Sequence, residues 1–199
     1  MLDYGSGNLR SAQRALERAG AAVTVTADRR AAVDADGLMI PGVGAFAACM
    51  AGLLGIGGDE IVAERQRRAR PSLAVCVGMQ VVFDDGDEHG HHTRGLAVLP
   101  GRVERLDAPV LPHMGWNTVQ APATSVLFGD VADERFYFVH SYGVRPGPAL
   151  AELATVTTSD YGAPFVAAVE SGVLSATQFH PEKSGDAGAH LLATWVGTL

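Results

Sequence analysis

With 199 residues, of which 47% are hydrophobic and 19% charged, the chain has the size and apolar content of one soluble α/β domain over residues 1–199. Its net charge of −7 argues against general nucleic-acid binding, and it has no apolar run long enough to cross a membrane. No secretion signal follows Met1, and Cys49 and Cys76 are too few for a disulfide framework. We therefore expect a cytoplasmic protein with both thiols reduced.

In the first half, Ala-rich helical stretches alternate with short aliphatic runs, which is typical of a parallel sheet covered by helices. We expect helices over residues 8–19, 45–54 and 60–68 and strands over residues 23–26, 37–40 and 72–75. The locally basic run 65–70 is interpreted as the solvated end of a helix.

The second half changes character, because short strand-like segments follow one another with turns between them. The expected strands cover residues 103–105, 136–139, 153–157, 165–169 and 173–178, and a final helix covers residues 185–195. Residues 84–94 and 146–149 are polar or rich in Pro and Gly, so we expect flexible surface there. No internal repeat or low-complexity linker divides the chain.

Cys76 stands at the most informative point of the chain. An apolar run ends at this cysteine and turns at once into helix-compatible sequence. A strand-to-helix elbow of this kind projects the side chain at its apex, and a helix N-terminus there would favour the thiolate. A buried cysteine at a strand end is nevertheless more often a small core residue. Cys76 alone therefore does not indicate catalysis.

A base and a carboxylate stand far downstream, at His180 and Glu182. Pro181 lies between them and keeps this short segment out of a helix, and positions two apart share a face of an extended chain. The sequence therefore predicts a triad in which Glu182 orients His180 and His180 deprotonates Cys76.

Acyl transfer by such a triad also needs an oxyanion hole, in which a single donor contributes about 3 kcal/mol. Gly42 and Gly44 flank Val43 after another apolar run, in a turn that can present backbone N–H groups. An ordinary loop is the alternative for these two glycines, and it is favoured when they are taken alone.

Together these motifs resemble the class I glutamine amidotransferases, whose elbow is Gly-x-Cys-x-Gly and whose other two catalytic residues come from a His-Pro-Glu segment. The closer resemblance is to the family of glutaminase subunits of imidazole glycerol phosphate synthases. Five sequence blocks in the family's order carry it: residues 3–8 (Asp-Tyr-Gly-Ser-Gly-Asn), 41–46 (Pro-Gly-Val-Gly-Ala-Phe), 112–117 (Pro-His-Met-Gly-Trp-Asn), 138–142 (Phe-Val-His-Ser-Tyr) and 179–184 (Phe-His-Pro-Glu-Lys-Ser).

The resemblance implies an α/β fold of the class I glutamine amidotransferase-like (flavodoxin-like) type. This is a three-layer sandwich with a mostly parallel central sheet flanked by helices and a second, smaller antiparallel part. It also implies hydrolysis of the side-chain amide of glutamine through a thioester on Cys76. The N–H of Val77 and, after a peptide reorientation, that of Val43 would bind the oxyanion. The residues implied to line the glutamine pocket are Gly44, Gln80, Ser141 and Tyr142.

The same resemblance implies a partner, a (β/α)8-barrel cyclase subunit. This partner would use the ammonia to make imidazole glycerol phosphate and an aminoimidazole carboxamide ribonucleotide in histidine biosynthesis. Asn8, Tyr137 and Lys183 match positions that lie toward the cyclase in the family. Two alternatives stay open: a glutaminase subunit of another class I amidotransferase, or a non-catalytic partner-binding subunit of the same fold.

The chain departs from the family pattern at two places. Ala74 stands where the elbow usually has glycine, and we expect its methyl group to be tolerated because it does not occupy the apex. Only Leu2 and Asp3 precede the turn at residues 4–5, so we expect the family's first strand to be nearly absent unless the native start lies upstream of Met1.

A histidine-rich stretch, Glu-His-Gly-His-His at residues 88–92, could suggest a metal cluster. We interpret it as a polar surface loop, because zinc ligands need a fourth partner and a rigid scaffold. His113 and His140 are interpreted as structural or pocket-supporting. Neither a metal nor a cofactor is expected.

Overall fold

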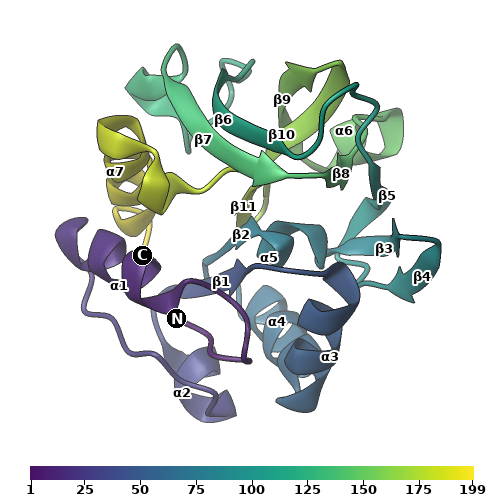
Figure 1. Ribbon diagram of the computed structural model, residues 1–199. Coiled ribbons are helices and arrows are strands. Elements are labelled where there is room, and N and C mark those ends of the chain that lie inside the picture. Colours follow the sequence, from purple (N-terminus) through teal and green to yellow (C-terminus); the bar gives the residue numbers. More distant parts are fainter.

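A five-stranded sheet forms the centre of the protein in the computed structural model, which describes residues 1–199 (Figure 1). β1, β2 and β11 run parallel, whereas β10 pairs antiparallel with both β11 and β9. Every residue of β1 and β2 is buried, as is usual for the apolar runs of a covered parallel sheet. The strands lie in the order β1 (Leu38–Gly42), β2 (Ser72–Cys76), β11 (Leu174–Thr177), β10 (Ala163–Ser171) and β9 (Thr155–Tyr161).

Two groups of helices accompany this sheet. α1 (Leu9–Arg18) packs beside α7 (Gly185–Val196), while α2 (Arg29–Asp34), α3 (Phe46–Gly55) and α4 (Gly58–Arg67) gather in a second group (Figure 1). No single helix is long and apolar enough to cross a membrane, and only α3 and α4 taken together, across a 77° bend, reach the required length and composition. The expected α/β fold is confirmed. Its two parallel pairs are those that β2 forms with β1 and with β11.

A smaller sheet holds β4 (His91–Arg94), β3 (Phe83–Glu88), β5 (Leu99–Arg105) and β8 (Tyr142–Val144), in that order. Its β3–β5 pair is parallel and the other two pairs are antiparallel. β6 (His113–Thr118) and β7 (Arg135–His140) form a separate antiparallel hairpin. The remaining elements are the short helices α5 (Val77–Gln80) and α6 (Pro148–Leu153) and the 3-10 turns η1 (Gly129–Val131) and η2 (Pro181–Lys183).

Aromatic packing attaches the β6–β7 hairpin to the central sheet. The rings of Phe136 and Phe179 have centroids 4.4 Å apart, and Phe138 meets Phe165 edge to face at 5.6 Å. All four side chains are fully buried, and each contributes roughly 2–3 kcal/mol relative to an exposed ring. Because Phe179 directly precedes His180, this cluster also fixes the segment that carries the predicted base.

Residues 84–94 lie at the surface as expected, but they form the paired strands of the β3–β4 hairpin rather than an irregular loop. The chain reverses at His89 and Gly90, both of which have positive φ, 54° and 76°. Most positions of the hairpin face solvent, and the inward position at Gly86 has no side chain at all. A Cβ there would lie 3.0 Å from the ring of Phe46, so glycine lets the hairpin pack on α3 without displacing that ring.

Residues 23–26 do not form the expected strand. Only an isolated parallel bridge joins Thr26 to Leu2, although Leu2 in turn donates its N–H to the Met39 carbonyl at 2.9 Å. Residues 1–3 therefore contribute a single bridge, which is too little for a ladder with residues 23–26. Residues 146–149 include the start of α6 rather than only flexible surface. The elements α2, β6 and β8 were not predicted; α2 and β8, with six and three residues, are too short to show a period.

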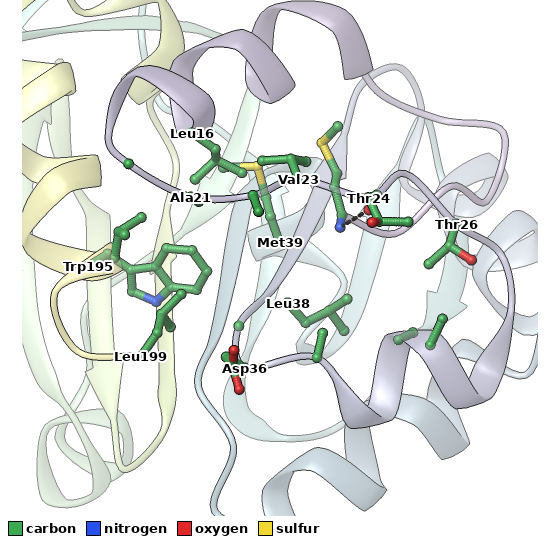
Figure 2. A pocket seen from close by; sticks show the side chains of 18 residues that line it. Leu16, Ala21, Val23, Thr24, Thr26, Asp36, Leu38, Met39, Trp195 and Leu199 are labelled. Carbon is green, nitrogen blue, oxygen red and sulfur yellow. Dashed lines mark hydrogen bonds between the residues drawn. The ribbon is translucent and has the colours of Figure 1, made fainter.

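A cavity of about 710 Å³, larger than the one that opens onto the triad, lies beside this edge of the sheet (Figure 2). Thr24 and Thr26 lie on one side of it, and Trp195 and Leu199 at the end of the chain lie on another (Figure 2). None of the residues of the predicted triad lines this cavity. Size alone therefore does not identify the site of the chemistry.

Arg65 is fully buried, so the interpretation of residues 65–70 as a solvated helix end was wrong at its first position. Its guanidinium donates to Ser72 Oγ and to five backbone carbonyls, those of Ala32, Val33, Ala35, Asp36 and Pro71. Burial, with a smaller effect of the nearby Arg70, lowers the pKa of Arg65 to about 10, so the group stays charged at neutral pH. This side chain joins the end of α2 to the start of β2.

We expect Arg65→Ala to lower the free energy of unfolding by about 3 kcal/mol or more, because several buried carbonyls would lose their donor. Urea unfolding of the purified chain measures this value. The matched control is Arg67→Ala on the same helix, whose exposed side chain should contribute within about 0.5 kcal/mol. Similar unfolding midpoints for the two variants would contradict the structural role of Arg65.

Candidate active site

Cys76 lies at a strained turn between β2 and α5. Its backbone has φ 57° and ψ −115°, a conformation that a residue with a side chain rarely adopts. This is the geometry of a nucleophile elbow, in which the turn aims the side chain out of the sheet. α5 has only four residues, so the contribution of its dipole to thiolate stability is smaller than the sequence suggested. Ala74 lies within buried β2 and leaves the apex to Cys76.

Two glycines allow the elbow to press against the end of β1. A Cβ on Gly78 would lie 2.1 Å from the Ile40 carbonyl oxygen, and a Cβ on Gly42 would lie 2.2 Å from the Gly78 nitrogen. Both distances are too short for any side chain. The backbone turn that carries Val43 and Gly44 is thereby held directly beside Cys76.

His180 and Glu182 meet in the segment that follows β11. His180 Nδ1 lies 2.7 Å from Glu182 Oε1, and both side chains are 3% exposed. Burial by itself lowers the pKa of His180, but its hydrogen bonds and charge interactions with Cys76 and Glu182 outweigh burial and raise the pKa to about 9. The structure therefore places an imidazole that favours its protonated form between a thiol and a buried carboxylate.

A cavity of about 430 Å³ opens onto these residues. Cys76 and His180 line it, together with both residues expected to supply oxyanion donors, Val43 and Val77. All four residues expected in the glutamine pocket also line it, namely Gly44, Gln80, Ser141 and Tyr142. The sequence motifs that lie far apart in the chain thus converge on one hollow at the carboxyl ends of β1 and β2.

Gln178 is a site residue that the sequence analysis did not single out. Its side-chain nitrogen approaches Cys76 Sγ at 3.8 Å, and its side-chain oxygen accepts a hydrogen bond from Gln80 Nε2 at 3.0 Å. Gln80 Nε2 also donates to the Tyr142 carbonyl at 2.9 Å. Gln80 therefore orients the polar wall beside the sulfur. Gln178 stands two residues before His180, and positions two apart share a face of an extended chain, so this spacing could have placed Gln178 beside the site.

A pair of histidines continues this polar network into the β6–β7 hairpin. His140 Nδ1 bonds to the Tyr142 carbonyl at 2.9 Å, and His140 Nε2 bonds to His113 Nδ1 at 3.0 Å. Asn117 Nδ2 lies 3.3 Å from His113 Nε2. Burial lowers the pKa of His113 to about 4 and that of His140 to about 3. Both rings are thus neutral at pH 7, with each nitrogen committed to one partner.

Two charged residues at the mouth of the cavity were also missed. Glu88 lies at the end of β3, and its Oε2 accepts the Phe46 N–H at 2.8 Å, while Arg105 lines the cavity from the end of β5. The stretch 88–92 does not gather its side chains in one place: His92 Nε2 lies 3.4 Å from Asp85 Oδ2, while Glu88 points to the cavity. The alternation of the β3–β4 hairpin was the signal that could have placed Glu88.

The residues expected at a partner interface lie around the same site. Lys183 is exposed and lines the cavity, and Asn8 lines a small recess that also touches His180 and Glu182. Tyr137 is half-buried and meets Trp116 edge to face at a centroid distance of 6.0 Å. Their roles toward a partner stay predictions.

Residues 1–196 match the family model described as "Glutamine amidotransferase class-I". The chain is 60% identical to "Imidazole glycerol phosphate synthase subunit HisH" of Thermobifida fusca (strain YX), over 100% of this chain and 97% of that protein. It is 61% identical to the protein of that name from Mycobacterium tuberculosis (strain ATCC 25618 / H37Rv), with the same coverage. A solved structure titled "Crystal structure of glutamine amidotransferase" superposes with a TM-score of 0.75, at 19% identity, over 98% of this chain and 97% of that one.

The low pKa values of His113 and His140 predict a loss of stability in acid. Below about pH 6.5 the unfolded chain takes up protons on these histidines while the folded chain does not, so the free energy of unfolding falls as the pH falls toward 4. In His140→Gln this dependence should be weaker by about 1.4 kcal/mol per pH unit near pH 5, because the unfolded variant takes up one proton fewer than the unfolded wild-type chain.

Chemical denaturation between pH 4.5 and 7 measures this slope. His190→Gln is the matched control, because His190 lies exposed on α7. An unchanged slope in His140→Gln would show that His140 is not held neutral by the fold.

Proposed function

The chain belongs to the class I glutamine amidotransferases, and we propose that its 199 residues form a single domain acting as the glutaminase subunit of an imidazole glycerol phosphate synthase. In this role it hydrolyses L-glutamine to L-glutamate and ammonia in the cytoplasm. The ammonia passes to a cyclase subunit that makes imidazole glycerol phosphate and an aminoimidazole carboxamide ribonucleotide in histidine biosynthesis. The full-length relatives at 60–61% identity, named as that subunit, support this branch of the family.

The observation that carries the hydrolytic activity is the position of His180 between Glu182 and Cys76 at one cavity. Because His180 Nδ1 is bonded to Glu182, His180 Nε2 is the nitrogen that exchanges a proton with Cys76 Sγ. A thiolate is the reactive form of cysteine, and a protonated imidazole beside it stabilises that form. These three residues are the proposed catalytic triad.

The reaction then proceeds through a thioester. Cys76 Sγ attacks the side-chain carbonyl carbon of glutamine, and the C–N bond breaks as His180 gives its proton to the departing ammonia. His180 next takes a proton from water, which attacks the thioester carbonyl and releases glutamate and the Cys76 thiolate. Glu182 keeps the imidazole in one orientation and stabilises its positive charge through both steps.

Backbone N–H groups at Val77 and Val43 are the proposed oxyanion donors. The Val43 N–H is bonded instead to Ser6 Oγ at 3.1 Å, so its peptide must reorient before both donors reach the substrate. Gly44, Gln80, Ser141 and Tyr142 bind the glutamine chain in the cavity. Its α-amino and α-carboxylate groups carry opposite charges, and Glu88 and Arg105 at the cavity mouth offer a carboxylate and a guanidinium that match them.

A partner surface next to this site fits the proposed cyclase subunit, a (β/α)8 barrel. Met114 and Trp116 on β6 are 65% and 50% exposed, and Trp116 contacts the half-buried Tyr137. Exposed apolar side chains that gather in this way mark protein interfaces. Asn8, Tyr137 and Lys183 are proposed to couple that surface to the triad.

The decisive experiment measures glutamate release from glutamine by the purified chain, alone and with a cognate cyclase barrel and its nucleotide ligand. We expect a low rate alone and strong stimulation by the liganded barrel. Activity that is indifferent to the barrel would assign the chain to another class I amidotransferase. Absence of activity in every mixture would favour a non-catalytic partner-binding subunit.

Substitutions in the triad should differ in severity. We expect Cys76→Ala to abolish glutamate release without loss of barrel binding, whereas Glu182→Gln should retain part of the rate because water can replace an orienting group. In the complex, kcat/KM should fall above about pH 9, where His180 loses its proton. Glu182→Gln should move this fall to lower pH, because the carboxylate raises the pKa of His180.

A pH–rate profile of the wild-type chain and of Glu182→Gln, each with saturating barrel, measures the fall of kcat/KM at high pH and its movement in the variant. Glutamate release by Cys76→Ala at the wild-type rate would remove Cys76 from the mechanism. An alkaline limb that does not move in Glu182→Gln would remove the carboxylate from control of His180.

A further inference from the structure

Gln178 contacts the Cys76 sulfur from outside the substrate cavity. It is 1% exposed, and it is not among the residues that line the cavity of about 430 Å³ at the triad. Its Nε2 lies 3.8 Å from Cys76 Sγ, in the geometry of an N–H···S hydrogen bond. A side chain in this place can act on the sulfur without touching the glutamine.

The orientation of the Gln178 amide follows from an atom that can only accept. The Tyr142 carbonyl has no hydrogen to give, so Gln80 turns its Nε2 toward this oxygen, at 2.9 Å. The same nitrogen donates to the side-chain oxygen of Gln178 at 3.0 Å. Reversing the Gln178 amide would place its NH2 group against the NH2 group of Gln80. The side of Gln178 that faces Cys76 is therefore its donor.

The Tyr142 carbonyl is itself held by the histidine pair. His140 Nδ1 lies 2.9 Å from this oxygen and donates to it, which leaves Nε2 of the neutral ring as an acceptor. His113 Nδ1 supplies the donor to that nitrogen at 3.0 Å, and Asn117 Nδ2 lies 3.3 Å from His113 Nε2. One set of proton positions satisfies every contact from Asn117 to the sulfur, and in that set the sulfur of Cys76 receives a hydrogen.

The backbone around Gln178 leaves its side chain little freedom. The Gln178 N–H donates to the Ala167 carbonyl at 2.8 Å, and Thr177 Oγ1 donates to the Phe179 carbonyl at 3.0 Å. Phe179 is fully buried in the aromatic cluster that attaches the β6–β7 hairpin. The amide is thus aimed at the sulfur before any substrate binds, which is the condition for electrostatic preorganisation.

We propose that Gln178 is a further catalytic residue, the hydrogen-bond donor that stabilises the Cys76 thiolate, and that Gln80 is the positioning residue that aims it. This inference rests on the proposed function. A thiolate accepts a stronger hydrogen bond than a thiol, because the bond is assisted by charge. The donor therefore favours the reactive form of the sulfur. When water opens the thioester, the C–S bond breaks with its electron pair going to sulfur, and the same N–H stabilises the departing thiolate.

Other groups beside Cys76 do not duplicate this donor. α5 has only four residues, so its dipole contributes little to thiolate stability. His180 gives its proton to the departing ammonia and takes another from water during turnover. The amide of Gln178 never releases its hydrogen, so it remains a donor through both steps.

The experiment compares Gln178→Met with Gln178→Glu. Methionine has a similar length and no polar hydrogen, whereas an ionised glutamate keeps the shape of glutamine and presents only acceptor oxygens to the sulfur. Gln120→Glu is the matched control, because it makes the same chemical change on an exposed side chain. Thermal melting of each variant reports its folding.

The first measurement is the ultraviolet absorbance of the thiolate in the substrate-free chain, recorded over a pH series. Each variant is compared with its own Cys76→Ala derivative, which subtracts the signal of Cys49. At a given pH we expect the thiolate-to-thiol ratio of Cys76 to fall about tenfold in Gln178→Met and further in Gln178→Glu. The ratio in Gln120→Glu should stay within about twofold of the wild-type value.

The second measurement is glutamate release with the liganded barrel. In Gln178→Met, kcat should fall about tenfold while KM for glutamine stays within about twofold, because Gln178 does not line the substrate cavity. A residue that only supports the shape of the cavity would raise KM and leave the thiolate ratio unchanged. The two measurements together therefore distinguish a donor from a structural residue.

The positioning role of Gln80 has its own test in the substrate-free chain. Gln80→Met should lower the thiolate ratio less than Gln178→Met does, because the amide of Gln178 is still present but is no longer aimed. The double variant should be no lower than Gln178→Met alone, since both changes remove the same donor. Additive decreases would reject Gln80 as the positioning residue.

An unchanged thiolate ratio in folded Gln178→Met and Gln178→Glu would overturn the proposal. If neither variant folds, nitrogen-15 NMR of the wild-type chain still tests it: the neutral ring of His140 should carry its proton on Nδ1, and a proton on Nε2 would overturn the proposed orientation. No glutamate release by the wild-type chain with liganded barrel would reject the proposed function. Activity there with an unmoved thiolate ratio in Gln178→Met would reject the donor alone.

Discussion

The contact between the end of β1 and the turn after β2 is the constraint on which the site depends. Gly42 and Gly78 bring two backbones closer than any side chain would allow. This contact places the turn at Val43 beside the strained Cys76. If either glycine carried a Cβ, the two strand ends would separate and the nucleophile would lose its neighbouring donors. The chemistry of the site is therefore set first by the absence of two side chains.

A directed chain of hydrogen bonds builds on that contact. The Tyr142 carbonyl accepts from Gln80 on one side and lies against His140 on the other. Because both histidines of the network are buried and neutral, each of their nitrogens has one defined role as donor or acceptor. The polar wall near Cys76 thus has a fixed orientation that begins in the β6–β7 hairpin. In contrast to these two neutral histidines, His180 has a pKa that is raised by its interactions with Cys76 and Glu182, so its protonated form is favoured.

Local sequence pattern was sufficient where one element carries its own signal. The expected helices 8–19, 45–54, 60–68 and 185–195 all occur, as do the strands at 37–40 and 72–75, with shifted ends. The β3–β4 hairpin was missed because its segments are mostly polar and exposed and show no alternation of apolar residues. Cys76, His180 and Glu182 stand in recognisable motifs. Gln178 approaches the sulfur only through folding, since 102 positions separate it from Cys76.

The cavity beside the sheet edge gives this protein a route to greater stability that is independent of its chemistry. Its wall contains several alanines, among them Ala21, Ala31 and Ala35, and no residue of the proposed triad (Figure 2). Larger aliphatic side chains introduced there would bury additional apolar surface at roughly 25 cal/mol per Å². A protein engineer could therefore raise the melting temperature from this side of the sheet while the Val43 turn keeps the mobility that turnover requires.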